Sequence, residues 1–252
     1  MRVFRRILPL IICLGLVFTT GCASKKNEEE PIDTRSAEQV YEAGLQEIHA
    51  KHFKEAAELF SKVAYEFPYH DLAARAHLME IYSYYLMSDY DSVIPATDNF
   101  IKIFPASSDI PYIYYLRSLA YYEQIDAPVR DQTMTEDAKA AFEELIARFP
   151  NTAYAKDGKF KLDLINDHLA GQEMDIGRYY LYSGNMISAI NRFKVVVEQY
   201  QTTTHIQEAL YRLVEAYAFL GLNDEARKNA EVLGYNYPDS NWYKGAYKLV
   251  KK

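Results

Sequence analysis

The feature that most constrains the fold is a four-part pattern that recurs along the chain. A small residue is followed about four residues later by an aromatic or apolar residue, then by another apolar residue, and in most copies by a proline. Periods of this kind, in the range of about 20 to 50 residues, are typical of stacked helix hairpins. The five copies are Ala56, Phe60, Val63 and Pro68; Val93, Phe100 and Pro105; Ala138, Phe142, Leu145 and Pro150; Ala189, Phe193 and Val196; and Ala226, Ala230, Leu233 and Pro238.

Each part of the pattern has a physical role in a helix hairpin. The small residue lets two antiparallel helices approach closely, the aromatic fills the groove between them, and proline ends the second helix because it cannot continue the backbone hydrogen bonding. Stacked hairpins then share a continuous core and leave a curved inner surface that commonly binds partners. We therefore predict an all-α fold, an α–α superhelix (solenoid) of about five tetratricopeptide-type helix hairpins. The expected repeats are 37–70, 73–106, 110–150, 155–201 and 204–238, within a repeat domain of residues 37–252.

Two kinds of segment interrupt the helical pattern. Gly184 and Gly221 stand where the fourth and fifth hairpins are expected to turn, in keeping with the left-handed conformation that ends a helix. Residues 125–134 widen the third hairpin, and a polar insertion of this kind is expected to form a surface loop.

The first 21 residues have the three parts of an export signal. Residues 1–6 are basic, residues 7–18 are apolar and uncharged, and small residues precede Cys22. The apolar run is too short for the roughly 20 residues of a membrane-spanning helix. We therefore expect residues 1–21 to be removed.

The sequence TTGC at this point resembles the lipobox of bacterial lipoproteins, which implies a covalent lipid on Cys22. After removal of the leader, Cys22 is the only thiol of the chain, so no disulfide can form within it. An ordinary cleavage site with an incidental cysteine is the alternative. Acyl chains would tether the protein without a spanning helix, and the polar residues 22–36 would form a flexible leash. In the lipoproteins that this site resembles, an aspartate after the cysteine is an inner-membrane retention signal. The resemblance, with Ala23 at that position, therefore implies the outer membrane.

Charge and motifs exclude several classes of function. Without the leader the chain carries 25 basic and 35 acidic residues, a balance that argues against binding nucleic acid. His49 and His52 lie three residues apart without a third ligand, so we expect no metal site. No nucleotide-binding or hydrolase motif is present. A helical peptidoglycan lyase is the best enzyme hypothesis, but its usual Glu-Ser pair is absent, so we expect a scaffold, with no cofactor beyond the lipid.

Most of the chain resembles the BamD (ComL) family, the tetratricopeptide lipoproteins of the outer-membrane β-barrel assembly machinery. A lipid-anchored leash followed by five repeats is also the family arrangement. The matching stretches are Tyr41 to Pro68, YIYYLRSLAYY at 112–122, VRDQ at 129–132, AKAAFEELIARFPNT at 138–152, and RYYLYSGNMISAINRF at 178–193.

The resemblance implies a function and a set of partners. Family members lie at the periplasmic face of the outer membrane, bind the periplasmic domains of the barrel protein BamA, join other lipoproteins of the complex, and receive the C-terminal signal of unfolded β-barrel clients. The N-terminal repeats are the family's client-binding half and the C-terminal repeats hold BamA. By position, Arg192 matches the family's arginine near the BamA contact. The alternative is a tetratricopeptide lipoprotein that scaffolds peptidoglycan or cell-division enzymes in the periplasm.

Aromatic residues of the N-terminal half are the candidate client-binding groove. Tyr82 with Tyr85, and Tyr112 with Tyr115, lie three apart on two successive first helices, and Tyr41 belongs to the first repeat. Packing between helices is the alternative for each tyrosine. Arg117 is a candidate for the client carboxylate, with an ion pair to Asp109 or Glu123 as the alternative. For Arg192 the alternatives are an ion pair with BamA, an internal pair, or a solvated side chain.

Overall fold

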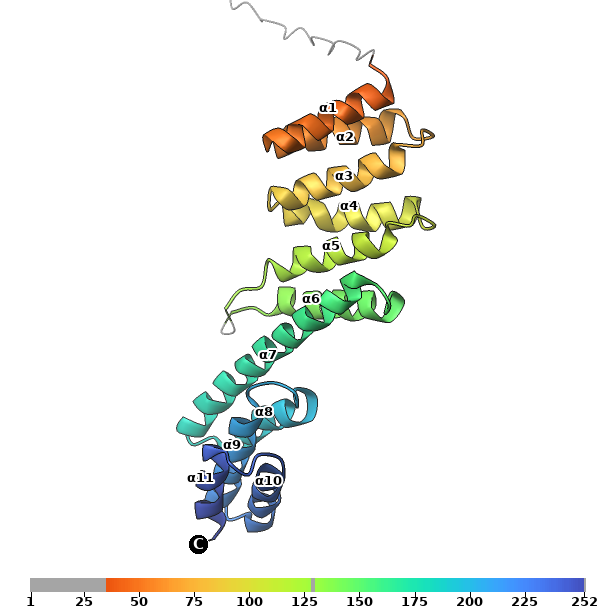
Figure 1. The fold of residues 1–252 in the computed structure, drawn as a ribbon. Coiled ribbons are helices and arrows are strands. Elements are labelled where there is room, and N and C mark those ends of the chain that lie inside the picture. The colour runs from red at the N-terminus through yellow and green to blue at the C-terminus, as the bar shows by residue number, and fades with distance from the viewer. Residues whose placement is uncertain (1–34, 128–129, 252) are drawn as a thin grey trace, which may run out of the picture. The chain divides into compact units, whose positions relative to one another are not determined.

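The computed structural model describes residues 35–127 and 130–251, which belong to one compact unit, Arg35–Lys252. The predicted leader, the lipidation site Cys22 and nearly all of the leash lie outside the described residues. The described part contains helices and no strand, so the predicted all-α hairpin fold is confirmed (Figure 1). The helices are α1 Ala37–Ala50, α2 Phe53–Glu66, α3 Ala73–Leu86, α4 Tyr90–Ile103, α5 Ile110–Tyr122, α6 Thr133–Arg148, α7 Ala153–Tyr182, α8 Met186–Gln199, α9 Ile206–Phe219, α10 Asn223–Asn236 and α11 Asn241–Val250.

The helices pair in chain order into five hairpins, and each helix from α1 to α10 contacts the next. The first helices of the hairpins are α1, α3, α5, α7 and α9. Contacts of α3 with α5, and of α5 with α7, bring three of these first helices together on one side of the stack. Side chains from different repeats can therefore combine into one surface there.

Fully buried phenylalanines form the centre of successive hairpins. Phe60, Phe100, Phe142 and Phe193 are each 0% exposed. Room for these rings also comes from glycine on the facing first helix. A Cβ added to Gly44 would lie 2.8 Å from the ring of Phe60, and one added to Gly177 would lie closer still to the ring of Phe193. The two helices of each of these hairpins can approach this closely because Gly44 and Gly177 have no side chain.

The second helices end in a common way, with an aromatic residue as the C-cap. Four of these caps precede a proline, which disfavours the helical conformation of the residue before it. Tyr200 has no proline after it, yet α8 ends there with similar backbone angles. Its ring is nearly buried, so packing of the ring can position the helix end where proline is missing. The five C-caps are Phe67, Phe104, Phe149, Tyr200 and Tyr237.

The hairpin turns follow the sequence expectation at the fourth and fifth hairpins. Gly184 and Gly221 have φ angles of 80° and 75°, in the left-handed region. The first two hairpins place Lys51 and Ser88 in the same region, with φ of 63° and 59°. Glycine therefore marks only the last two turns.

The pattern did not predict α11, which follows the fifth hairpin and packs against α9 and α10. Ala246 is fully buried, and the ring of Trp242 lies 5.3 Å from that of Tyr211. A Cβ on Gly245 would come within 2.9 Å of the Tyr211 ring. The helix thus covers the apolar side of the last hairpin.

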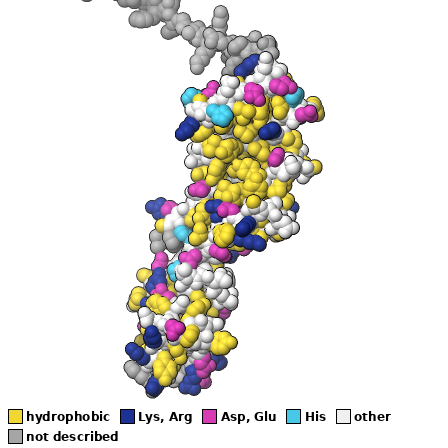
Figure 2. All heavy atoms as spheres, viewed as in Figure 1, with side chains coloured by type: hydrophobic (Ala, Val, Ile, Leu, Met, Phe, Trp, Pro, Cys, Tyr) yellow, Lys and Arg dark blue, Asp and Glu magenta, His cyan; other side chains and the backbone are white. Residues whose placement is uncertain are grey.

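Hydrophobic side chains gather on the viewed face over the N-terminal hairpins (Figure 2). Over the C-terminal hairpins, apolar and charged side chains are more intermixed on this face. None of the helices in the described residues is both long and apolar enough to span a bilayer.

Candidate functional site

Five tyrosines from three first helices come together on one side of the stack. We call them the tyrosine cluster: Tyr82 and Tyr85 of α3, Tyr112 and Tyr115 of α5, and Tyr154 of α7. The ring of Tyr154 lies 5.3 Å from those of Tyr112 and Tyr115. The structure thus unites four of the tyrosines predicted from the sequence and adds Tyr154, which the sequence analysis missed.

The cluster combines packing with partial exposure. Tyr85, Tyr112, Tyr115 and Tyr154 pack against the main core while remaining only partly buried. Burial raises the pKa of Tyr112 to about 12, and the neighbouring Tyr82 and Tyr154 add to the rise. The hydroxyl of Tyr112 is therefore neutral at physiological pH, and this residue presents an aromatic face and a hydrogen-bonding group without charge.

Tyr115 also links two hairpins through its hydroxyl. That hydroxyl donates a hydrogen bond of 2.7 Å to the carboxylate of Asp157 on α7. Burial is the largest cause of the raised pKa of Tyr115, and this hydrogen bond is the next largest. One tyrosine of the cluster is therefore oriented by a fixed partner.

Tyr41 lies apart from the tyrosine cluster, in the core of the first hairpin. It is 5% exposed, and its ring makes an edge contact with Phe60 at 5.3 Å. Arg75 of α3 is near enough to lower the pKa of Tyr41, although burial raises it more. Arg75 is exposed and lies two helical turns before Tyr82, so it is the basic residue on the same face of α3 as the cluster.

Arg117 points away from the cluster, into the contact of α5 with α4 and α6. Its guanidinium donates to Asp98 at 2.8 Å and to Glu144 at 2.5 Å, and it lies over the ring of Tyr114. The alternative of an internal ion pair is therefore found, but the partners are residues 19 and 27 positions away and not Asp109 or Glu123. Both arms of Arg117 are thus held by carboxylates of its own chain.

Arg192 of α8 is paired within the chain and partly exposed. Its Nη1 contacts both carboxylate oxygens of Glu173 on α7, at 3.1 and 3.2 Å, and 42% of its side chain is exposed. It lines a shallow hollow of about 280 Å³ together with Tyr180, Ser188 and Asn191. The internal pair orients the guanidinium while leaving part of it open to a partner.

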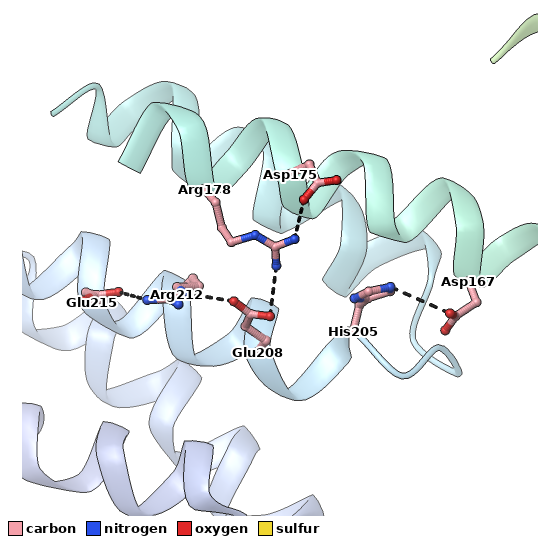
Figure 3. Close-up of polar contacts among 7 residues, drawn as sticks. All are labelled: Asp167, Asp175, Arg178, His205, Glu208, Arg212 and Glu215. Carbon is pink, nitrogen blue, oxygen red and sulfur yellow. Dashed lines mark hydrogen bonds and ion pairs between the residues drawn. The ribbon is translucent and has the colours of Figure 1, made fainter. Parts of the chain in front are cut away.

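A chain of ion pairs joins the fourth and fifth hairpins (Figure 3). Glu208 of α9 accepts from Arg178 of α7 at 3.0 Å and from Arg212 at 3.2 Å. Arg178 also pairs with Asp175, and Arg212 with Glu215. These ion pairs, in which acidic and basic side chains alternate, connect α7 to α9 and fix the position of one helix against the other.

A second polar contact joins α7 to the turn that precedes α9. Asp167 of α7 accepts 2.8 Å hydrogen bonds from the backbone N–H and the hydroxyl of Thr204, and lies 3.7 Å from His205 (Figure 3). The two contacts together connect the start of α9 to α7, the helix that also carries Glu173, the partner of Arg192.

Comparisons with known proteins agree with this architecture. The family model YfiO, described as an outer membrane lipoprotein, matches residues 33–233. A protein of Rickettsia prowazekii, the outer membrane protein assembly factor BamD, is 47% identical over 98% of this chain and 97% of its own length. The protein of the same name from Caulobacter vibrioides is 41% identical over 99% of this chain and 83% of its own.

A more distant relative extends the likeness. The outer membrane protein assembly factor BamD of Neisseria meningitidis serogroup A is 30% identical over 92% of this chain and 91% of its own length. The chain belongs to the BamD family of outer membrane protein assembly factors.

Proposed function

We propose that this protein is a lipid-tethered scaffold that receives unfolded outer-membrane β-barrel clients at the tyrosine cluster and holds BamA through its fourth hairpin. The observation that carries the proposal is the convergence of Tyr82, Tyr112 and Tyr154 from three consecutive first helices. Aromatic side chains supply large contact area with a polar tip, which suits an aromatic, extended peptide. No covalent chemistry is required of such a scaffold.

Arg75 is the best candidate for the carboxylate at the end of a client. Arginine binds carboxylates bidentately, and the exposed Arg75 shares a helix face with Tyr82. Arg117, the earlier candidate, already pairs with Asp98 and Glu144. The client strand would therefore lie along the cluster with its carboxylate end toward α1.

Arg192 is the proposed contact for BamA. Its pairing with Glu173 limits the rotamers of the guanidinium, which lowers the entropy lost when a partner carboxylate binds. The neighbouring hollow offers polar side chains at its edge. Other lipoproteins of the assembly complex are further proposed partners.

The proposed location is the periplasmic face of the outer membrane, through acyl chains on Cys22. Mass spectrometry of the purified mature protein would find a lipidated Cys22 at the N-terminus. An N-terminal peptide with a free thiol would contradict this part of the proposal.

Client binding is tested with a fluorescent peptide that ends in phenylalanine, measured by anisotropy as the free acid and as the amide. Tyr82→Ala and Tyr112→Ala are expected to weaken binding of both peptides about tenfold, since each removes an aromatic contact. Arg75→Gln is expected to weaken binding of the free acid alone. Tyr235→Ala, at an 89% exposed position of α10, is the matched control.

Thermal melting separates binding from folding. Loss of affinity without a lower Tm supports the cluster as a binding surface, whereas unchanged affinity in both tyrosine variants contradicts it. A lower Tm with unchanged affinity assigns these tyrosines to packing.

A further inference from the structure

The outer face of α11 carries a stripe of lysines. Lys244, Lys248 and Lys251 are spaced by four and three residues, which places them on one helical face, and all three are exposed. Tyr247 lies among them with 48% of its surface exposed, and the amine of Lys251 is 5.5 Å from its ring centre. We call these four residues the lysine face.

The inner side of α11 is fixed to the protein, so the lysine face has one orientation. Ala246 is fully buried against the last hairpin, and the ring of Trp242 packs at a tilt against that of Tyr211. Gly234 of α10 touches the ring of Tyr243 so closely that a Cβ would come within 2.5 Å of it. The lysines therefore belong to a rigid surface of the unit.

The charge of this surface is opposite to that of the rest of the chain. Residues 241–252 contain four lysines and no acidic residue, whereas residues 22–240 contain 21 basic and 35 acidic residues. Among the described residues, none of Lys244, Lys248 and Lys251 forms an ion pair. The arginines Arg117, Arg178 and Arg212, by contrast, all pair within the chain.

Exposed apolar side chains lie near the C-terminal end of α11. Leu249 lines a hollow of about 460 Å³ with Phe219 and Tyr182. Phe219 is 71% exposed, and Leu222 in the following turn is 44% exposed. Aromatic and aliphatic tips beside lysines match the boundary between lipid headgroups and acyl chains.

We propose that the lysine face, together with Phe219, binds the anionic phospholipid headgroups of a bilayer surface. Protein–protein interfaces are enriched in arginine and depleted in lysine, so an all-lysine stripe favours a lipid surface over an acidic protein. Each lysine near an anionic bilayer contributes a similar attraction to the lipid headgroups, and salt weakens that attraction. This contact uses none of the residues assigned to the client and BamA sites.

The test is flotation of the mature chain carrying Cys22→Ser, which has no acyl chain, with two kinds of vesicle. One contains phosphatidylglycerol and phosphatidylcholine in equal parts, and the other contains phosphatidylcholine alone. We expect binding to the first only, and loss of that binding at high salt. The variant Lys244→Gln/Lys248→Gln/Lys251→Gln is expected to bind about a hundredfold more weakly.

The matched control is Lys54→Gln/Lys156→Gln/Lys159→Gln, which removes the same charge from exposed positions of α2 and α7. It is expected to keep most of the affinity. Phe219→Ser, which leaves the charge unchanged, is expected to weaken binding to the anionic vesicles. These two variants keep the test decisive if the triple α11 variant melts early.

Three results would overturn the proposal. They are failure of the mature chain carrying only Cys22→Ser to bind anionic vesicles, equal binding to both vesicles, and equal losses in the two triple variants. If vesicle binding is absent but the α11 variant loses a protein of the envelope during co-purification, the lysine face binds an acidic protein instead.

Discussion

Glu208 of α9 accepts a hydrogen bond of 3.0 Å from Arg178 of α7 and thereby connects the first helices of two successive hairpins. The same carboxylate accepts from Arg212, so one acidic side chain holds two guanidinium groups. Only 18% of the Glu208 side chain is exposed. The relative position of the last two hairpins therefore depends on a charge that water reaches poorly.

Replacement of Glu208 by glutamine is expected to lower the free energy of unfolding by about 1 to 2 kcal/mol, because two partly buried guanidinium groups lose their shared carboxylate. Urea denaturation measures the change. Glu198→Gln is the control, since its pair with Lys194 is a surface pair worth at most about 0.5 kcal/mol. Equal effects of the two substitutions would show that the α7–α9 chain of ion pairs contributes little.

Gly177→Ala is expected to destabilise the protein by about 1 to 3 kcal/mol, because the added methyl group would overlap the ring of Phe193. Gly158→Ala is the matched comparison on the same helix, where the nearest atom of Phe142 is 3.1 Å away. We expect a smaller cost there, and a gain in helix propensity that offsets part of it. A Tm of Gly177→Ala at or above that of Gly158→Ala would contradict the close packing at Gly177.

Alkaline pH is expected to destabilise the fold through the tyrosine cluster. The pKa of Tyr112 is about 12 in the folded protein, against about 10 when unfolded, so folding keeps this phenol protonated. Its contribution to stability is complete below pH ~10 and is lost as the pH rises toward ~12.

Absorbance titration of the phenolates checks this expectation. Tyr112→Phe should remove one of the late ionisations and reduce the fall in stability with pH. Tyr84→Phe should remove another late ionisation, because the pKa of Tyr84, which lies outside the cluster, is also raised to about 12. An unchanged late phase in Tyr112→Phe would be inconsistent with the burial of this hydroxyl.

The sequence predicted the second helices best, because their pattern has a direct physical cause. Phe60, Phe142 and Phe193 are fully buried, as the spacing requires, and Pro68 and Pro150 follow the helix ends. The fourth repeat was predicted to end at residue 201, close to the end of α8 at Gln199, although no proline follows this helix. Local rules of packing and backbone conformation sufficed at these positions.

The sequence predicted the site less completely, because pairing between repeats depends on which helices become neighbours. Tyr154 begins α7 outside the repeating pattern, so its place beside Tyr112 is visible only in the fold. The partners of Arg117 are similarly distant in sequence. The spacing of Trp242 and Ala246 was the available signal for α11, and the lysines between and after them obscured it.

Charge reversal at Arg192 is expected to release BamA. In a detergent pull-down through a tag at Lys252, Arg192→Glu should retain less BamA than the unaltered protein, because Glu173 and the new glutamate would repel an acidic partner. Glu173→Gln is the companion variant, and should weaken retention less, since Arg192 keeps its charge. Intact retention by Arg192→Glu, or recovery of cell-wall hydrolases in place of BamA, would contradict the proposed docking.

The central claim is that clients bind at the tyrosine cluster, and site-specific photo-crosslinking in living cells tests it most directly. A photoreactive residue at position 82 should capture newly exported β-barrel proteins, whereas the same residue at the exposed position 235 should capture few. Equal capture at the two positions, or no client at position 82, would contradict the account.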